Sequence, residues 1–416
     1  MSENTKILVV DDDFEAQKLI SFLLAGEDYT LVSAANGQEA LELINQGQNF
    51  SLVLLDIMMP DISGHEVCQR IRASHLSTEL PVIMITANED VTSLEKGFQA
   101  GTNDYIIKPF TRTELVSRVR SHLHLLEINN AFSRFVPQEI LKALGRESII
   151  KVELGDQIQG EMTIFFSDIR SFSDISEKLS PKENFEFLNR YLHVVTPPIK
   201  SNHGFVDKYI GDGILALFPV SADDAVNAAI DTMVQLSSFN TQRIADGDEA
   251  LSVGVGLHTG PMMMGTIGDE DRMDVTVISD AVNLASRLES LTKRFGCKIA
   301  ISETVFSNLK NPEQYYYRFL GKIQVKGKLD IVPIYEIYNG DSHENVLLKN
   351  ETRKGFEEGL KCYFGKNFAE AILQFKGVLD VNPKDKTALF YLKRAAELVV
   401  SEVPDDWQGV EAFRSK

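Results

Sequence analysis

Two aspartates in the middle of the sequence stand where strongly apolar runs end. The run EMTIFFSD ends at Asp168, and FVDKYIGDGILALF places Asp212 between two glycines, which supply the positive φ that a tight hairpin turn needs. If the first run forms a strand beside this hairpin, both carboxylates reach one point. Hard divalent cations prefer carboxylate oxygens, so the pair predicts a site for two metal ions that hold a polyphosphate. An aspartate in such a turn can also be only a turn residue, and this alternative stays open here.

Two further features can contact phosphate groups. A helix that opens at Ser171, Phe172 and Ser173 offers free N–H groups and the positive end of its dipole to phosphate oxygens. Lys326, in QVKGK, is a candidate cation for the same phosphate chain.

Four more side chains can contact a sugar and a base. Asn283 and Arg287 lie four residues apart in a predicted helix and therefore share a face. A neutral amide and a fixed guanidinium suit orienting a sugar and stabilising charge on a phosphoryl group during transfer, although a solvated helix face is the alternative. Lys208 and Thr276 each lie on a predicted strand and offer hydrogen bonds that can read a base edge.

A second group of polar residues follows apolar runs near the N-terminus. Asp11 and Asp12 follow KILVV, Asp56 follows SLVLL, Thr86 ends PVIMIT, and Lys108 lies in DYIIKPF. Such runs alternate with helical patterns, which predicts a doubly wound parallel sheet whose active crevice lies at the carboxyl ends of the strands. Three carboxylates there need a divalent cation such as Mg²⁺, while the lysine and the hydroxyl can hold an arriving anion. We interpret this as Mg²⁺-assisted phosphoryl transfer onto Asp56.

The elements that position these residues fall into four segments. We expect the parallel-sheet domain at 1–125, a helical linker at 126–155, an α+β domain at 156–340 and a helical tail at 341–416. The order of strands and helices in the third segment favours a largely antiparallel sheet with helices on one face.

The join between the first two domains has coiled-coil spacing. Val116, Val119, Leu123 and Leu126 follow a 3-4-3 spacing that continues to Asn130. This indicates a short seam between two chains, with a polar residue that can fix the register. The alternative is that the last helix of the first domain packs on its own sheet and continues as a linker.

The tail is similar to about one and a half tetratricopeptide repeats. The residues that carry this likeness are Phe356, Tyr363, Phe368, Ala371, Phe375 and Pro383. Such units need about three repeats to bury a core. We therefore expect the tail to dock on the preceding domain of its own chain, or else on a partner protein, with Trp407 as an anchor.

Composition excludes several classes of protein. A chain of 416 residues should form two to four domains, and a net charge of −18 argues against nucleic acid or an anionic membrane as the main partner. Three cysteines far apart in sequence give no disulfide framework. No apolar run is long enough to span a bilayer and no signal peptide opens the sequence, so we expect a soluble cytoplasmic protein.

The first segment resembles the response-regulator receiver domain. VVDDD, LLDIMMPDISG, MITA and DYIIKPF match it in order. The resemblance implies Mg²⁺ and a histidine kinase or other phosphodonor. It also implies that Asp11 and Asp12 are the acidic pair, that Asp56 is the phosphoacceptor and that the carbonyl of Met58 binds the metal. Thr86 and Lys108 would be the phosphate sensors, and Tyr105 the switching aromatic residue.

The third segment resembles the class III nucleotidyl cyclase catalytic domain, which has a ferredoxin-like α+β fold. FSDIRSF, DKYIGDGILALF, GLHTGPMMMG, DVTVISDAVNLASRLES and QVKGK carry the likeness. The resemblance implies that two Mg²⁺ or Mn²⁺ ions are bound by Asp168, Asp212 and the carbonyl of Ile169. It implies that Asn283 orients the ribose and that Arg287 stabilises the transition state.

The resemblance also bears on the substrate and on assembly. Lys208 and Thr276 are similar to the pair that reads adenine, and a lysine opposes the N1–H donor of guanine, so ATP is favoured. The family builds each site across a dimer interface, which implies a homodimer. The sequence therefore predicts a multidomain α/β adenylate cyclase that is gated by phosphorylation of Asp56. The alternatives are a catalytically silent ATP-binding signalling adaptor and a guanylate cyclase.

Overall fold

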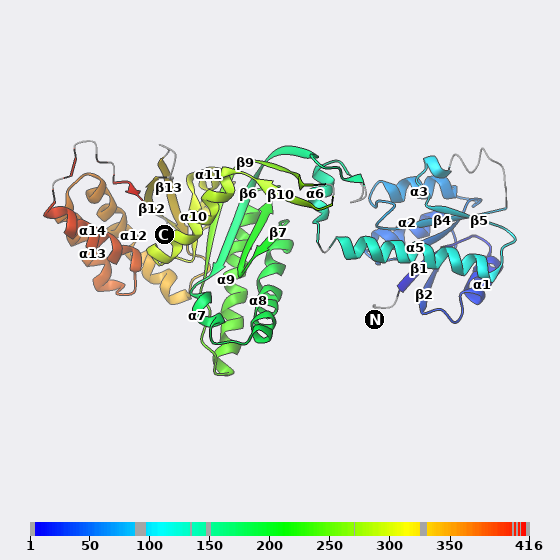
Figure 1. The fold of residues 1–416 in the computed structure, drawn as a ribbon, viewed down its shortest axis with the longest axis horizontal. Coiled ribbons are helices and arrows are strands. Elements are labelled where there is room, and N and C mark those ends of the chain that lie inside the picture. Colours follow the sequence, from blue (N-terminus) through cyan, green and yellow to red (C-terminus); the bar gives the residue numbers. More distant parts are fainter. Residues whose placement is uncertain are drawn as a thin grey trace. The chain divides into compact units, whose positions relative to one another are not determined.

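The computed structural model divides the chain into two compact units, Met1–Val152 and Glu153–Lys416 (Figure 1). It describes residues 5–412 except 88–96, 134, 147–150, 270, 325–330, 402, 405–406 and 408. Each unit is described here by itself. Among the helices described, none combines the length and the apolar character needed to cross a bilayer.

The first unit is built on a five-stranded parallel sheet with the order β2-β1-β3-β4-β5. Separate apolar clusters cover its two faces, so the predicted parallel-sheet receiver fold is confirmed. Its elements are β1 (Thr5–Val10), α1 (Phe14–Leu23), β2 (Tyr29–Ala34), α2 (Gly37–Asn45), β3 (Leu52–Asp56), α3 (Gly64–Arg72), β4 (Val82–Thr86), β5 (Asp104–Ile107), α5 (Arg112–Phe132) and α6 (Gln138–Ala143).

Helix α5 packs on the receiver sheet through the residues in which the sequence indicated a coiled-coil seam. Val116, Val119 and Leu123 are buried in the cluster that covers this face, whereas Leu126 is half-buried and Asn130 is exposed. The alternative is therefore correct for the first three positions, because an apolar stripe cannot cover its own sheet and a second helix at once.

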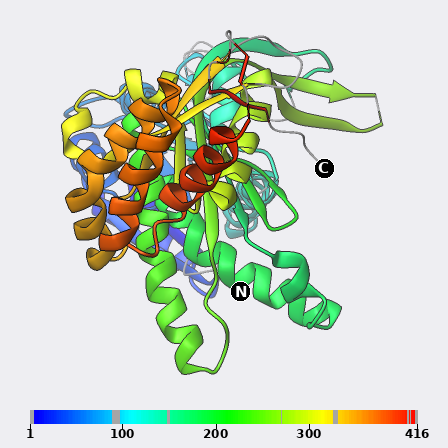
Figure 2. The ribbon, with the colours of Figure 1, turned by 90° about the vertical axis from the view of Figure 1, so that its left-hand side faces the viewer.

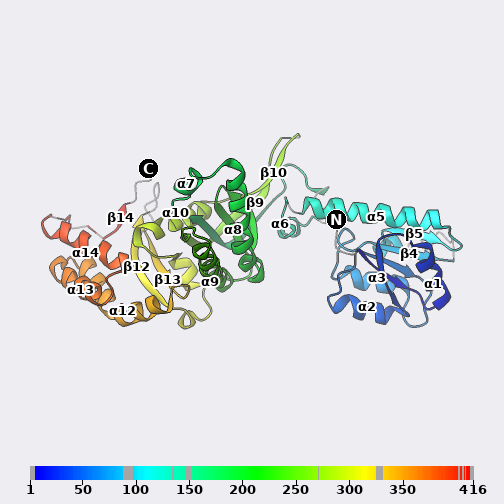
Figure 3. The same ribbon diagram turned by 90° about the horizontal axis from the view of Figure 1, so that it is seen from below.

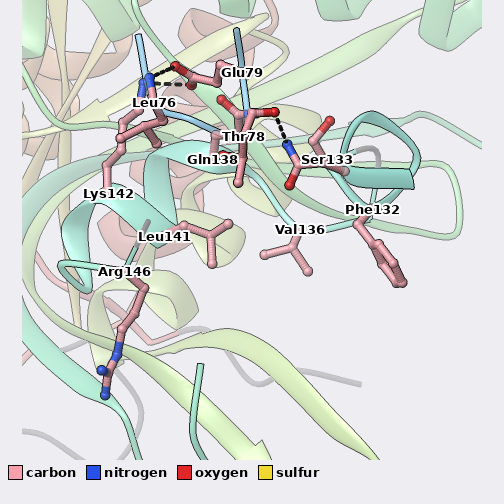
Figure 4. A pocket seen from close by; sticks show the side chains of 11 residues that line it. Leu76, Thr78, Glu79, Phe132, Ser133, Val136, Gln138, Leu141, Lys142 and Arg146 are labelled. Carbon is pink, nitrogen blue, oxygen red and sulfur yellow. Dashed lines mark hydrogen bonds and ion pairs between the residues drawn. The ribbon is translucent and has the colours of Figure 1, made fainter. Parts of the chain in front are cut away.

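Beyond α5, the short helix α6 lies against the loop that precedes β4 (Figure 4). The amide Nδ2 of Asn129 donates to the carbonyl of Thr78 at 3.3 Å, and Lys142 Nζ lies 3.7 Å from Glu79 Oε1. The cavity between them measures about 20 Å³, room for about one water molecule. It is too small to be a nucleotide site.

The second unit is built on a mixed sheet with the order β14-β12-β13-β11-β9-β6-β8-β7, to which β10 adds at β9. Its pairs are antiparallel except β9 with β11 and β12 with β14. Its elements are β6 (Gln157–Ile169), α7 (Phe172–Ser176), α8 (Pro181–Ser201), β7 (Phe205–Ile210), β8 (Gly213–Phe218), α9 (Ala222–Ala245), β9 (Val253–Gly268), β10 (Met273–Ile278), α10 (Asp280–Phe295), β11 (Ile299–Ser302), α11 (Glu303–Ser307), η2 (Pro312–Gln314), β12 (Tyr317–Gln324), β13 (Ile331–Ile337), α12 (His343–Phe364), α13 (Phe368–Val381), α14 (Lys386–Val399) and β14 (Glu411–Ala412).

Helices cover both faces of this sheet, so the expectation of helices on one face was wrong. In β11, Ile299 and Ile301 belong to a core with α8, α9 and α11, whereas Ala300 between them belongs to a second core with α10 and α12–α14. Strand residues alternate between faces, and here both faces are apolar because each has its own helices. The tail and the preceding domain thus form one compact unit (Figure 2).

Helix α10 lies unusually close to β9. A Cβ atom at Gly256 would lie 2.2 Å from the carbonyl oxygen of Ala285, so only glycine permits this approach. The glycines of LSVGVGLHTG therefore fix the position of α10 over the sheet.

Candidate active site

The first unit brings three of its predicted site residues together at the carboxyl ends of β1, β3 and β5. Lys108 Nζ lies 2.6 Å from Asp56 Oδ1 and 2.9 Å from Asp11 Oδ2. The backbone N–H of Met58 donates to the other oxygen of Asp56 at 2.7 Å. Thr86 is buried at the end of β4, and Asp12 is exposed beside the site.

The charges of this site are tightly coupled. Burial raises the pKa of the Asp56 carboxyl, and the nearby charge of Asp11 raises it further, although Lys108 acts in the opposite direction. Burial lowers the pKa of Lys108, but its hydrogen bonds to the two carboxylates outweigh burial and the pKa is raised. The ammonium thus offsets the repulsion between carboxylates, which is what a divalent cation would also do.

The predicted switching aromatic residue, Tyr105, faces inward. Its ring meets Phe98 edge-on at 5.2 Å, and a Cβ atom at Gly97 would lie 1.3 Å from its hydroxyl. Burial raises the pKa of Tyr105 to about 12. The absence of a side chain at Gly97 therefore makes this buried position possible.

In the second unit, β6 and the β7–β8 hairpin bring Asp168 and Asp212 together. Strands β6 and β8 pair antiparallel, with Ser167 opposite Ile214, so the end of β6 meets the hairpin turn. Gly211 has a φ of 64°, and the N–H of Ile169 donates to Asp212 Oδ2 at 3.1 Å. The two carboxylates therefore lie at one point, and the Gly-Asp-Gly segment is more than a turn.

Burial and the like charge of its neighbours perturb the pKa of Asp168 in this pair. Burial raises the pKa of Asp168 to about 7, and Asp212 contributes by accepting a hydrogen bond from the protonated carboxyl and by its negative charge. Glu289 on α10 adds to the negative field, and burial raises its own pKa to about 7. The ionised forms of these buried, neighbouring carboxylates are unfavourable unless a cation compensates them. Carboxylate oxygens are also the ligands that Mg²⁺ and Mn²⁺ prefer, so these acids fit either ion.

The sequence analysis did not select Glu289 or Arg170. Glu289 is buried on the face of α10 that packs on β9, and Arg170 donates to the carbonyl of Cys297 just after that helix. Glu289 could have been found from the sequence, because it lies four residues after Ala285, on the apolar face of a predicted helix.

The structure brings together the predicted base-reading pair. Lys208 Nζ on β7 donates to Thr276 Oγ1 on β10 at 2.5 Å. The carboxylate of Asp207, whose side chain is fully buried, lies 3.6 Å from the same ammonium. Within the described part of one chain, no hydrogen bond or ion pair joins this pair to Asp168 or Asp212.

Asn283 is exposed and Arg287 half-buried on α10, four residues apart as expected. Helix α7 begins at Phe172 after Ser171, which has a φ of 55° and lines a groove of about 750 Å³. The Phe172 ring stacks on Phe187 at 6.1 Å, so this segment can offer a ligand its backbone N–H groups but not that ring. Lys326 lies outside the described residues.

Comparison with known proteins matches two families to the two units. Residues 7–120 match the response regulator receiver domain, and residues 155–339 match the adenylate and guanylate cyclase catalytic domain. An adenylate cyclase of Anabaena cylindrica is 44% identical over 214 residues, which cover 50% of this chain and 43% of that protein. The terminal-differentiation-specific adenylate cyclase of Dictyostelium discoideum is 34% identical over 277 residues, 65% of this chain and 13% of that protein.

Among solved structures, a bacterial light-regulated adenylyl cyclase is 28% identical with a TM-score of 0.45, over 57% of this chain and 66% of that one. The chain spans less than half the length of the two curated relatives. The two family matches lie one in each unit, so the first unit contains a response regulator receiver domain and the second an adenylate and guanylate cyclase catalytic domain.

Proposed function

We propose that this chain is an adenylate cyclase that converts ATP to 3′,5′-cyclic AMP and pyrophosphate as a homodimer, and that phosphorylation of Asp56 regulates it. The observation that carries the choice of ATP is the contact between Lys208 and Thr276. The names of the two curated relatives agree with this choice.

The metal-binding part of the proposal rests on Asp168 and Asp212. Their carboxylates and the carbonyl of Ile169 would hold two Mg²⁺ or Mn²⁺ ions. Burial and the neighbouring Asp212 raise the pKa of Asp168, and bound cations would offset both effects. Such ions would activate the ribose 3′-hydroxyl and neutralise charge on the triphosphate. The backbone N–H groups at Ser171, Phe172 and Ser173 would contact phosphate oxygens, and Lys326 would add a cation.

Lys208 and Thr276 would select the base. The ammonium of Lys208 can donate to adenine N1, whereas guanine presents an N1–H donor at that position and leaves two donors opposed. The hydroxyl of Thr276 has lone pairs for both Lys208 and an adenine amino group. A site built this way discriminates strongly, because the wrong base leaves its polar groups unpaired.

The remaining residues would act on the reacting groups. Asn283 would orient the ribose so that the 3′-oxygen bonds to the α-phosphorus as the bond to pyrophosphate breaks, and the 3′-hydroxyl proton would pass to water. Arg287 stabilises the negative charge that develops on that phosphorus centre. We assign no side chain as the general base.

A dimer is supported by exposed apolar side chains on the strands that flank the Lys208–Thr276 pair. Strands β9 and β10 extend as an arm from the body of the second unit (Figure 3). Its exposed residues include Ile267 and Met273, each 46% exposed, and Ile278, 60% exposed. A second copy would cover them, and each site would then combine the Lys208–Thr276 pair of one chain with the Asp168–Asp212 pair of the other.

The test is to incubate the purified full chain with Mn²⁺-ATP or Mn²⁺-GTP and to identify the product. Cyclic AMP from ATP alone is expected. Lys208→Glu combined with Thr276→Cys should shift the preference toward GTP, while the exposed control Lys376→Glu should not. ATP binding without turnover would instead identify a signalling adaptor, and cyclic GMP a guanylate cyclase.

Regulation is tested separately with a small-molecule phosphodonor such as acetyl phosphate. Phosphorylation would add charge beside Lys108 and Thr86 and thereby rearrange their contacts. We expect it to change the rate of cyclic AMP formation in the wild type and not in Asp56→Asn. An equal response of both chains would exclude Asp56 as the regulatory site.

A further inference from the structure

The last helix of the tail contacts the end of the helix that carries Asn283 and Arg287. Thr387 Oγ1 on α14 donates to the carbonyl of Phe295, the last residue of α10, at 2.7 Å. The ring of Phe390 meets Phe295 edge-on at 5.3 Å. Neither contact is local, because the two helices are far apart in sequence.

The two helices meet tightly at this point. Gly296 ends α10 in the left-handed region with a φ of 71°, and a Cβ atom there would lie 2.4 Å from the Cβ of Lys386, the first residue of α14. The Arg294 guanidinium lies 5.0 Å from the centre of the Phe390 ring. Helix α14 therefore determines where the C-terminal end of α10 can lie.

A buried charge network holds α14 in turn. Asp385 caps α14 by accepting hydrogen bonds from the N–H groups of Thr387 and Ala388. Its carboxylate receives two hydrogen bonds from Arg318 on β12, at 2.5 and 3.2 Å, and Arg318 also donates to Glu336 on β13. We call Arg318, Glu336, Lys349 and Asp385 the seam network, since Lys349 on α12 pairs with Glu336 at 2.6 Å.

We propose that the tail is a positioning element for the cyclase reaction and that Thr387 is the positioning residue that fixes α10, and through it Asn283 and Arg287. This inference rests on the proposed function. A regular helix transmits a shift of its C-terminal end along its axis, and Arg287 lies about two turns from Phe295. Small misplacements of catalytic groups reduce turnover by large factors.

The experiment compares full-length variants in steady-state turnover of Mn²⁺-ATP. Thr387→Val removes the hydroxyl that contacts Phe295 and should lower kcat about tenfold. KM should change less than about twofold, because Thr387 contacts the C-terminal end of α10, whereas Thr276 lies on β10 just before the N-terminal end of that helix and Lys208 lies on β7. Thr387→Ser keeps the hydroxyl and should restore kcat.

The matched control is Tyr391→Phe. Its hydroxyl, also on α14, donates to the carbonyl of Leu320 on β12 at 2.5 Å, and the substitution keeps the ring that stacks on Phe295 at 6.3 Å. This variant loses one buried hydrogen bond of the tail and should keep the wild-type kcat. Thr387→Val loses two, because Thr387 Oγ1 also accepts a hydrogen bond from Arg318 at 3.1 Å. If Thr387→Val fails to fold, Phe390→Leu removes the ring contact with Phe295 and carries the same expectation.

A double-mutant cycle with Arg287→Ala distinguishes positioning from general destabilisation. If Thr387 acts through Arg287 or Asn283, Thr387→Val should cost clearly less than about tenfold in the Arg287→Ala or in the Asn283→Ala background. The inference is overturned if the losses multiply in both backgrounds, or if Tyr391→Phe lowers kcat as much as Thr387→Val does. A wild-type chain with no cyclase activity would instead overturn the proposed function, and this inference with it.

Discussion

Replacing Arg318 by methionine should destabilise the second unit selectively. Only 3% of the Arg318 side chain is exposed, and its guanidinium is held by Asp385, Glu336 and Thr387. Methionine has a similar length and fills much of the same space, so lost packing contributes little. The loss of stability should therefore come from the buried carboxylate that no longer has a cation as its partner.

The magnitude follows from which acid loses its partner. Glu336 keeps the ammonium of Lys349 at 2.6 Å, whereas no other cation of the described residues pairs with Asp385. Leaving one buried charge uncompensated costs about 3–5 kcal/mol, which lowers the midpoint of a unit of this size by about 10 °C. Adding Asp385→Asn removes the charge and keeps a good helix cap, so the double variant should recover to within about 1 kcal/mol of wild type.

Scanning calorimetry on the full chain measures this directly, with the receiver transition as an internal reference. Burial raises the pKa of Asp385, but the charge of Arg318, together with hydrogen bonds from Arg318 and from the N–H of Ala388, lowers it below its usual value. A carboxyl with a lowered folded-state pKa stabilises above its unfolded pKa and ceases to do so as pH falls through the folded value. The gap between wild type and Arg318→Met should thus narrow below about pH 4. A double variant no more stable than Arg318→Met would refute the reasoning.

Three further outcomes are expected. Asp212→Asn should lower Mn²⁺-dependent turnover by at least about a hundredfold, measured as cyclic AMP formed, and leave the unfolding midpoint without metal unchanged or higher, since it removes a like-charge contact. Gly256→Ala should cost about 1–3 kcal/mol in thermal unfolding, because its Cβ would lie 2.2 Å from the carbonyl of Ala285. Burial lowers the pKa of His258, which contacts Ser302 at 2.8 Å, to about 4; the folded protein therefore loses stability as pH falls from about 6.5 toward 4, and His258→Asn should flatten that dependence.

The sequence was sufficient to predict which side chains meet wherever strand ends place them. Asp168 and Asp212 meet through strand pairing and a glycine turn, both of which leave clear local patterns. The same holds for Lys108, since parallel strands that alternate with helices leave little choice of edge. Lys208 and Thr276 were paired only through the resemblance to the cyclase domain, since their strands β7 and β10 are not neighbours in the sheet. The catalytic and regulatory roles of all these residues remain predictions.

Which faces of the second unit's sheet are covered by helices could not be predicted in the same way. Expecting helices on one face was wrong because β11 alternates between two apolar environments, and a short strand of four apolar or small residues does not reveal this. The 3-4-3 spacing in α5 was ambiguous for a similar reason, since an apolar stripe looks the same whether it faces a sheet or a second helix.

The seam network was missed because its partners are distant in sequence. Arg318 pairs with Glu336 across 18 residues and with Asp385 across 67. A charged residue in a strand pattern is usually exposed, so no local signal marked Arg318 as buried. Only the fold of the tail against β12 reveals that its charge is compensated.

The second unit has two buried clusters of charged side chains, the seam network and the Asp168–Asp212 pair, and they differ in how their charges are compensated. In the seam network each carboxylate has a cation within hydrogen-bonding distance, and Lys349 also pairs with Asp341 at 2.6 Å, so the protein itself compensates these charges. Asp168 and Asp212 face each other, with Glu289 adding to the negative field, and the pKa of Asp168 rises to about 7. A protein gains no stability from keeping such acids together. We propose that a positively charged ligand accounts for their proximity. Helix α10 supplies Glu289 at one turn and Phe295 at its end, and it thereby links that acidic site to the network that anchors the tail.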